Sequence, residues 1–200
     1  MEMGMRKVLL AVFAVVALGG CAAMQAQNPG AGYGPVNAQP SEGGRVMLGG
    51  YDVVSYFTEN RAQRGAPAHR STHKDIVFQF ASAENKARFD AAPEKYLPQY
   101  GGYCANGIVY GIPWGGNGDS WRMIDGKLYI FGGNGSRDAF LLDAKANIAL
   151  ADGYWKDEVE GSNSLLQRYK RVTFRVPHYK TGEELAKMVA EARAAGRLKE

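Results

Sequence analysis

The side chain best suited to chemistry is that of Cys104, which lies in the segment QYGGYCANG. A thiol acts as a nucleophile or as a soft metal ligand where its surroundings favour the thiolate. Gly101 and Gly102 would let a ligand approach the backbone closely, and we expect Tyr100 and Tyr103 to wall a small ligand pocket beside the thiol. The alternative is that Cys104 is a buried residue in a glycine-shaped turn, since free cysteines commonly pack as apolar groups.

The other candidate metal ligands are His69, His73 and Met123, which together with Cys104 could bind a soft ion such as Cu(I). His69 and His73 are four residues apart, a spacing that would place both on one face of a helix. Their segment, AHRSTHKDIVF, lacks helical periodicity and leads into a strand. In an extended chain four residues span about 13 Å, which is too far for two ligands of one ion. We therefore expect both residues, and His178, to be polar surface residues.

The sequence contains none of the common catalytic motifs. It has no Cys-x-x-Cys, no G-x-S-x-G, no H-E-x-x-H and no Gly-Lys-Ser/Thr after its glycine clusters. Turn and surface roles account for its acidic residues, namely Asp52, Asp119, Asp125 and the run at 157–160. We therefore expect a non-enzymatic binding or accessory module. Two alternatives stay open, a structural module of the cell envelope and a thiol enzyme that uses Cys104 as its nucleophile.

The start of the chain has the layout of a secretory signal. Arg6 and Lys7 precede an apolar run at 8–18, which is too short for a spanning helix because such a helix needs about 20 residues. The following Leu-Gly-Gly-Cys is similar to the bacterial lipobox, which implies that 1–20 is a lipoprotein signal peptide and that Cys21 becomes the acylated N-terminus. The same resemblance implies the outer membrane, facing the periplasm. Ordinary cleavage near Cys21 is the alternative.

Residues 21–44 are rich in Gly, Ala, Pro and Gln and predict a flexible tether of roughly 25–30 Å. The chain has a formal net charge of +4, and residues 161–200 hold nine Lys/Arg against four Asp/Glu. The basic excess therefore belongs to the tail, which argues against nucleic-acid binding by the main domain. The tail could contact anionic lipid headgroups, the cell wall or an envelope protein. The alternative is that its last helix packs on the domain.

Local patterns predict most helices and strands. Ser82 is expected to cap a helix, and Asp125 with Gly126 predicts a tight hairpin turn. Thr181 and Glu184 form a capping box for a final helix. The remaining expected elements are strands at 45–57, 75–80 and 171–176 and a helix at 137–151.

Three stretches together resemble YHS-domain proteins of the exported bacterial type. They are GYDVVSYF at 50–57, FASAENKARFDAAPEKYLPQYGGYCANG at 80–107 and WRMIDGKLYIF at 121–131. The resemblance implies a small α+β fold of short antiparallel strands and a few helices, related to the treble-clef-like metal modules called TRASH domains. We place this domain at 45–158, followed by a basic extension of one strand and one helix at 159–200. The resemblance implies no established catalytic activity.

Metal-binding members of that family carry thiolates at positions that align with Ser55, Ala81 and Asn85 of this chain. None of these three residues can supply a thiolate, and a structural zinc site needs about four Cys or His ligands. We therefore expect no structural zinc and expect aromatic packing to hold this part together. The aromatic residues concerned are Tyr56, Phe57, Phe78, Phe80 and Phe89.

Overall fold

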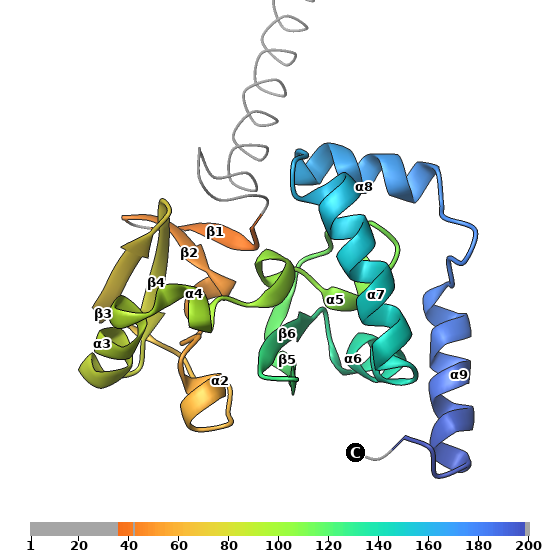
Figure 1. Cartoon of the computed structure of the whole chain (residues 1–200), viewed down its shortest axis with the longest axis horizontal. Coiled ribbons are helices and arrows are strands. Elements are labelled where there is room, and N and C mark those ends of the chain that lie inside the picture. Colours follow the sequence, from red (N-terminus) through yellow and green to blue (C-terminus); the bar gives the residue numbers. More distant parts are fainter. Residues whose placement is uncertain (1–35, 42, 199–200) are drawn as a thin grey trace, which may run out of the picture.

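The computed structural model describes residues 36–41 and 43–198, and its fold is α+β, as the sequence predicts (Figure 1). The strands are β1 Ala38–Ser41, β2 Gly44–Met47, β3 Ala66–His73, β4 Ile76–Phe80, β5 Asn117–Ile124 and β6 Lys127–Phe131. The helices are α2 Ser55–Thr58, α3 Ala83–Ala91, α4 Pro93–Tyr96, α5 Ala105–Ile108, α6 Asn134–Leu141, α7 Ala144–Tyr154, α8 Ser164–Thr173 and α9 Gly182–Ala194. Shorter helical turns are η1 Leu48–Gly50, η2 Gln99–Gly102 and η3 Trp155–Val159.

Two of the sequence predictions concern residues before this range. The signal segment at 1–20 and the lipidated Cys21 lie outside the described residues. Among the helices that are described, none combines the length and the apolar character that crossing a membrane requires.

The first four strands form one sheet in the order β1-β2-β4-β3. The outer pairs are antiparallel, whereas β2 and β4 run parallel. This parallel pair differs from the prediction, which expected antiparallel strands only. Alternate residues of a strand point to the same side. In β4 the residues on the core side are Ile76, Phe78 and Phe80, and all three are buried. The aromatic packing predicted here is confirmed, because Phe89 of α3 contacts both Phe78 and Phe80.

The predicted tether ends earlier than expected. Residues within 21–44 were assigned to a flexible linker, but Val36 and Ala38 are buried, and β1 pairs with β2. Gly43 and Gly44 make the tight connection between these strands, both with positive φ, a conformation that glycine adopts without steric cost. The last part of the predicted linker therefore forms β1, the strand at the edge of the sheet.

The β5–β6 hairpin separates two hydrophobic clusters. Its turn is the predicted one, with Asp125 and Gly126 both at positive φ. Successive residues of β6 point to opposite sides, as in any strand. Ile130 lies in the cluster under the first sheet, and Tyr129 and Phe131 lie in the second cluster, which is covered by α5, α6 and α7. Figure 1 shows the hairpin between these two halves.

The two helices predicted from an N-terminal capping residue are both present. Ser82 accepts a hydrogen bond from the Asn85 amide at the start of α3. The expected helix at 137–151 is divided into α6 and α7, because Asp143 caps a new helix by accepting from the amide of Ala146. The capping box of Thr181 is present at the start of α9.

The strand predicted at 171–176 is wrong. Residues 164–173 form α8, and the side chain of Asn163 caps it by accepting hydrogen bonds from the amides of Leu165 and Leu166.

The prediction that the last helix packs on the domain is confirmed. Val189 and Ala192 of α9 are buried, and α9 packs beside α6 (Figure 1).

Candidate functional site

A cavity of about 160 Å³ opens beside Cys104. It lies between the start of α5, the start of α6 and the segment that leads into α9. Its walls combine aromatic rings, hydrogen-bonding groups and one cation. The lining residues are Cys104, Asn106, Gly107, Tyr110, Trp114, Ser136, Tyr179, Lys180, Gly182 and Leu185.

The thiol of Cys104 is held in place by backbone contacts from three segments. The residue precedes α5, its amide donates to the carbonyl of Trp114 at 2.8 Å, and its own carbonyl accepts from the Gly107 amide at 2.8 Å. It also bridges to Ile130 of β6. Cys104 is a free cysteine and is only 3% exposed. These contacts fix the backbone of Cys104 beside the cavity, and its side chain is buried there.

The thiol of Cys104 is protonated at neutral pH. Burial raises its pKa, while hydrogen bonds from the backbone of Gly132 and Gly107 and from the Ser136 hydroxyl oppose that rise without cancelling it. A reactive cysteine needs an exposed, electropositive setting that lowers the pKa. The geometry therefore supports a neutral thiol that donates or accepts a weak hydrogen bond, and it disfavours the alternative of a thiol nucleophile.

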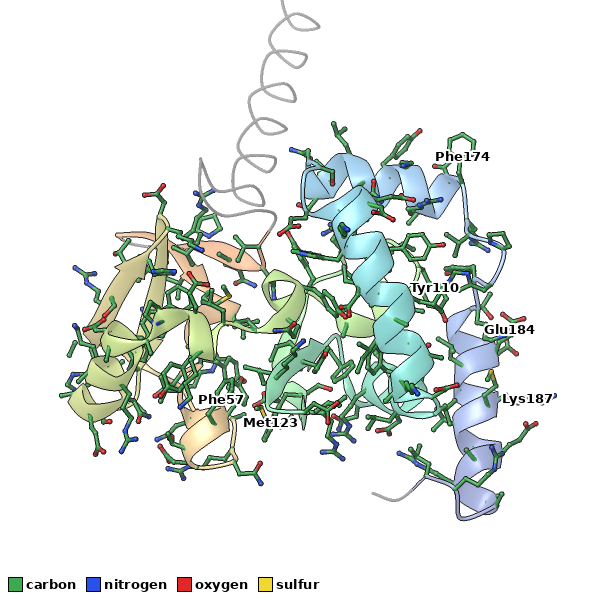
Figure 2. The ribbon with its side chains drawn as sticks, viewed as in Figure 1. Phe57, Tyr110, Met123, Phe174, Glu184 and Lys187 are labelled. Atoms are coloured by element: carbon green, nitrogen blue, oxygen red, sulfur yellow. The ribbon has the colours of Figure 1, made fainter. Side chains whose placement is uncertain are left out.

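Stacked aromatic rings form the outer wall. The ring of Tyr110 lies 5.2 Å from that of Tyr179 and 5.7 Å from that of His178. The imidazole of His178 is part-buried and hydrogen-bonds the Val109 carbonyl at 2.9 Å. The expectation that His178 is a free surface residue is thus wrong, because its ring is packed between Tyr110 and Tyr154. Figure 2 shows Tyr110 close to the first turn of α9.

Tyr100 and Tyr103 do not line this cavity. The Tyr100 hydroxyl donates to Asp152 at 2.8 Å, and its ring contacts Tyr129 and Trp155. The backbone of Tyr100 has positive φ, which turns its side chain toward α7. Tyr103 instead lines a second cavity of about 270 Å³ together with Val36 and Arg168. The expected pocket beside the thiol exists, but other aromatic residues wall it.

The candidate metal ligands are not brought together. His69 and His73 lie on β3, in the extended conformation that the sequence predicts, and His73 pairs with Glu94 at 3.0 Å. Met123 packs against the cluster under the first sheet, near Phe57 in Figure 2, whereas Cys104 belongs to the second cluster. Over residues 36–41 and 43–198, no three His, Cys, Asp or Glu side chains gather as a metal site.

One carboxylate contacts the three positions to which the sequence resemblance drew attention, namely Ser55, Ala81 and Asn85. Asp52 is fully buried and accepts from the Ser55 amide at 3.3 Å, from the Ala81 amide at 2.8 Å and from the Asn85 side chain at 2.8 Å. A fourth donor is the Val54 amide at 2.8 Å. The expectation that Asp52 has only a turn or surface role is wrong, since this carboxylate joins three chain segments at one point.

Sequence reasoning missed Ser136, Tyr179 and Lys180. The signal for Ser136 was the glycine-rich run at 132–135, which precedes a helix and so presents backbone amides to a neighbour. Tyr179 and Lys180 follow a segment that was assigned to a strand, and only the turn before α9 brings them to the cavity. Comparison with protein-family models, with curated proteins and with solved structures finds no match to this chain.

Proposed function

We propose that this chain is a lipid-anchored periplasmic binding module of the YHS type, without catalytic activity, and that it holds a small organic ligand in the cavity beside Cys104. The observation that carries the proposal is the composition of that cavity. Trp114, Tyr110 and Tyr179 offer aromatic surface, Lys180 offers a positive charge, and Ser136 offers a hydroxyl. A concave site with apolar walls and a few polar groups is the usual form of a small-molecule site.

The cavity favours an organic molecule over a soft metal ion. Its described lining supplies one sulfur, and that sulfur is protonated because burial raises the pKa of Cys104. Cu(I) prefers thiolate and thioether ligands. A ligand with a flat apolar part and an anionic group would instead stack on the rings and pair with Lys180. At about 160 Å³ the space is below the roughly 300 Å³ of drug-sized sites, so the ligand is compact.

The anchoring part of the proposal rests on the sequence. The lipobox-like Leu-Gly-Gly-Cys supports acylation of Cys21 and an outer-membrane location facing the periplasm. The three stretches that resemble YHS domains support the accessory role. An anchor and a small-ligand cavity together describe a protein that retains a compact molecule at the envelope.

Native mass spectrometry of the full chain, purified from the cells that make it, tests the cavity. Gly182 lines the cavity, and a Cβ there would meet nothing within 4 Å, so Gly182→Leu adds bulk at the cavity from an unobstructed position. Gly153→Leu is the matched control, because Gly153 is equally unobstructed and lies on α7. We expect a bound mass in the wild type and in Gly153→Leu and its loss in Gly182→Leu. A bound mass that survives Gly182→Leu, or none in any protein, contradicts the proposal.

A further inference from the structure

Helix α8 carries its apolar side chains on the outside. Leu166, Tyr169 and Val172 are all exposed, Tyr169 to 74%, and Phe174 just beyond the helix is 69% exposed. These residues, with Leu165, recur at the spacing of one helix face. We call them the α8 outer face. Figure 2 shows Phe174 at the far end of α8, at the edge of the molecule.

Three polar side chains of the same helix contact the domain. Gln167 is buried and donates to the Gly111 carbonyl at 3.0 Å, and Arg168 donates to the Pro113 carbonyl at 2.9 Å. Arg171 pairs with Glu158. A surface helix of a water-soluble domain normally does the reverse, with its apolar stripe on the core and its charges in water. The inverted arrangement shows that packing on the domain does not explain the apolar residues of α8.

The segment of chain that carries the α8 outer face has a net positive charge. Residues 161–180 contain five Lys/Arg and no Asp/Glu, whereas 181–200 contain four of each. The whole basic excess of the tail therefore belongs to α8 and to the segment after it. Lys170 and Arg175 are exposed beside the apolar residues, and Lys170 also pairs with Glu158 at 3.1 Å. Apolar and aromatic side chains bordered by cations are typical of helices that lie in the interface of an anionic bilayer.

The first described residue lies next to α8, because Val36 lines the same cavity as Arg168 of α8. The composition of the segment that begins at Cys21 predicts a tether, whose reach as far as Val36 would be about 20 Å. An anchor at Cys21, as proposed above, would therefore hold α8 close to the membrane surface, and this step rests on the proposed function.

We propose that the α8 outer face docks on a bilayer whose headgroups carry anionic phosphate. Tyr169 and Phe174 would insert at the level of the headgroups, and Lys170 and Arg175 would pair with the phosphates. A second copy of the chain is a poorer occupant, because pairing this face with itself would bring like charges together. The docking orients the domain on the membrane, which a flexible anchor alone cannot do. It does not depend on the ligand of the Cys104 cavity.

The test places a polarity-sensitive fluorophore on the full chain. A background variant, Cys21→Ser, removes acylation, and Cys104 is buried, so a cysteine introduced by Phe174→Cys is the reactive one. Lys187→Cys, on the exposed side of α9 (Figure 2), is the matched control and carries the same N-terminal segment. With vesicles that contain phosphatidylglycerol, we expect the emission of the probe at 174 to move to shorter wavelength and that of the probe at 187 to stay.

A single charge variant tests the role of the cations. Arg175→Gln should raise the lipid concentration that half-saturates the signal at 174 by about fivefold, because one cation contributes about 1 kcal/mol. Arg197→Gln removes the same charge from the opposite part of the tail and should change that concentration by less than about twofold.

Three outcomes overturn the proposal. The probe at 174 could respond no more than the probe at 187. It could respond equally to vesicles of phosphatidylcholine alone, which would show that binding does not need anionic headgroups. It could also shift without vesicles as the protein concentration rises, which would assign the α8 outer face to a second copy. None of these results bears on the bound mass expected in the Cys104 cavity, so the two proposals can fail separately.

Discussion

The carboxylate of Asp52 accepts a hydrogen bond of 2.8 Å from the side-chain amide of Asn85, a residue of α3 that lies 33 positions further along the chain. With the Ala81 amide on the same oxygen and the Val54 amide on the other, this bond ties the end of β4, the start of α3 and the turn before α2 together. The donors include Ser55, Ala81 and Asn85, the three positions to which the sequence resemblance to YHS domains drew attention. A single buried carboxylate therefore organises this corner.

We expect Asp52→Ala to destabilise the protein by about 3 kcal/mol or more, because several buried donors lose their acceptor at once and each unsatisfied donor costs about 1–3 kcal/mol. Urea unfolding measures the change. Asp157→Ala is the control, since Asp157 is an exposed carboxylate, and it should shift the free energy of unfolding by less than about 0.5 kcal/mol. Equal effects of the two substitutions would show that Asp52 does not organise the fold.

The thiol of Cys104 makes stability depend on pH in the alkaline range. Its folded pKa lies above the unfolded value because burial penalises the thiolate. The folded state therefore binds the proton more tightly, and its contribution is fully present below the unfolded pKa of about 8.5 and is lost as pH rises beyond it. We expect the free energy of unfolding to fall less between pH 7 and pH 9.5 in Cys104→Ala than in the wild type. Parallel pH profiles would contradict the buried, protonated thiol.

Glu158 fastens α8 to the domain. Burial favours its neutral form, but hydrogen bonds from Arg171, Gln167 and Lys170 outweigh that effect and keep the pKa of Glu158 below its usual range. We expect Glu158→Ala to increase amide hydrogen exchange throughout α8 while β4 stays protected. Because the folded pKa is lowered, the stabilisation is present above the unfolded pKa of about 4.3 and is lost as pH falls through the folded value.

The control for the Glu158 experiment is Glu160→Ala, which removes an exposed carboxylate two residues away. Exchange in α8 should stay close to that of the wild type in this variant. Uniform acceleration in every element by Glu158→Ala would mean that the residue supports the whole fold and does not clamp α8 alone.

The sequence GGNG occurs at 115–118 and at 132–135, and we expect an alanine substitution in each copy to change stability in opposite directions. A Cβ at Gly118 would lie 2.4 Å from the ring of Tyr51, whereas a Cβ at Gly135 would meet nothing within 4 Å. We expect Gly118→Ala to lower the free energy of unfolding by about 1–3 kcal/mol through overpacking. Gly135→Ala, within α6, should raise it by about 0.5–1 kcal/mol because alanine favours the helix. Thermal unfolding of both variants measures the contrast, and a similar loss in both would contradict it.

The sequence was informative where a few neighbouring residues decide the structure. Ser82, the Asp125-Gly126 turn and the capping box of Thr181 each act within three residues, and all three were predicted correctly. The α+β class, which the YHS resemblance implied, is also the class of the observed fold. The alternation of apolar residues in β4 also predicted its buried side.

The errors came from contacts between distant segments. Val172, Phe174 and Val176 alternate as in a strand, but Asn163 caps a helix there and Glu158 binds its inner side. Strand prediction from alternating apolar residues assumes that those residues pack on a core. In α8 the apolar side chains face outward, so the assumption fails there. For the cavity beside Cys104, only the neighbourhood of the thiol could be predicted, since Lys180 reaches it from a distant part of the chain.

Closing this corner with one carboxylate makes a single side chain responsible for several connections. The donors to Asp52 come from Val54, Ser55, Ala81 and Asn85. Loss of that side chain would therefore release β4, α3 and the turn before α2 from one another at the same time.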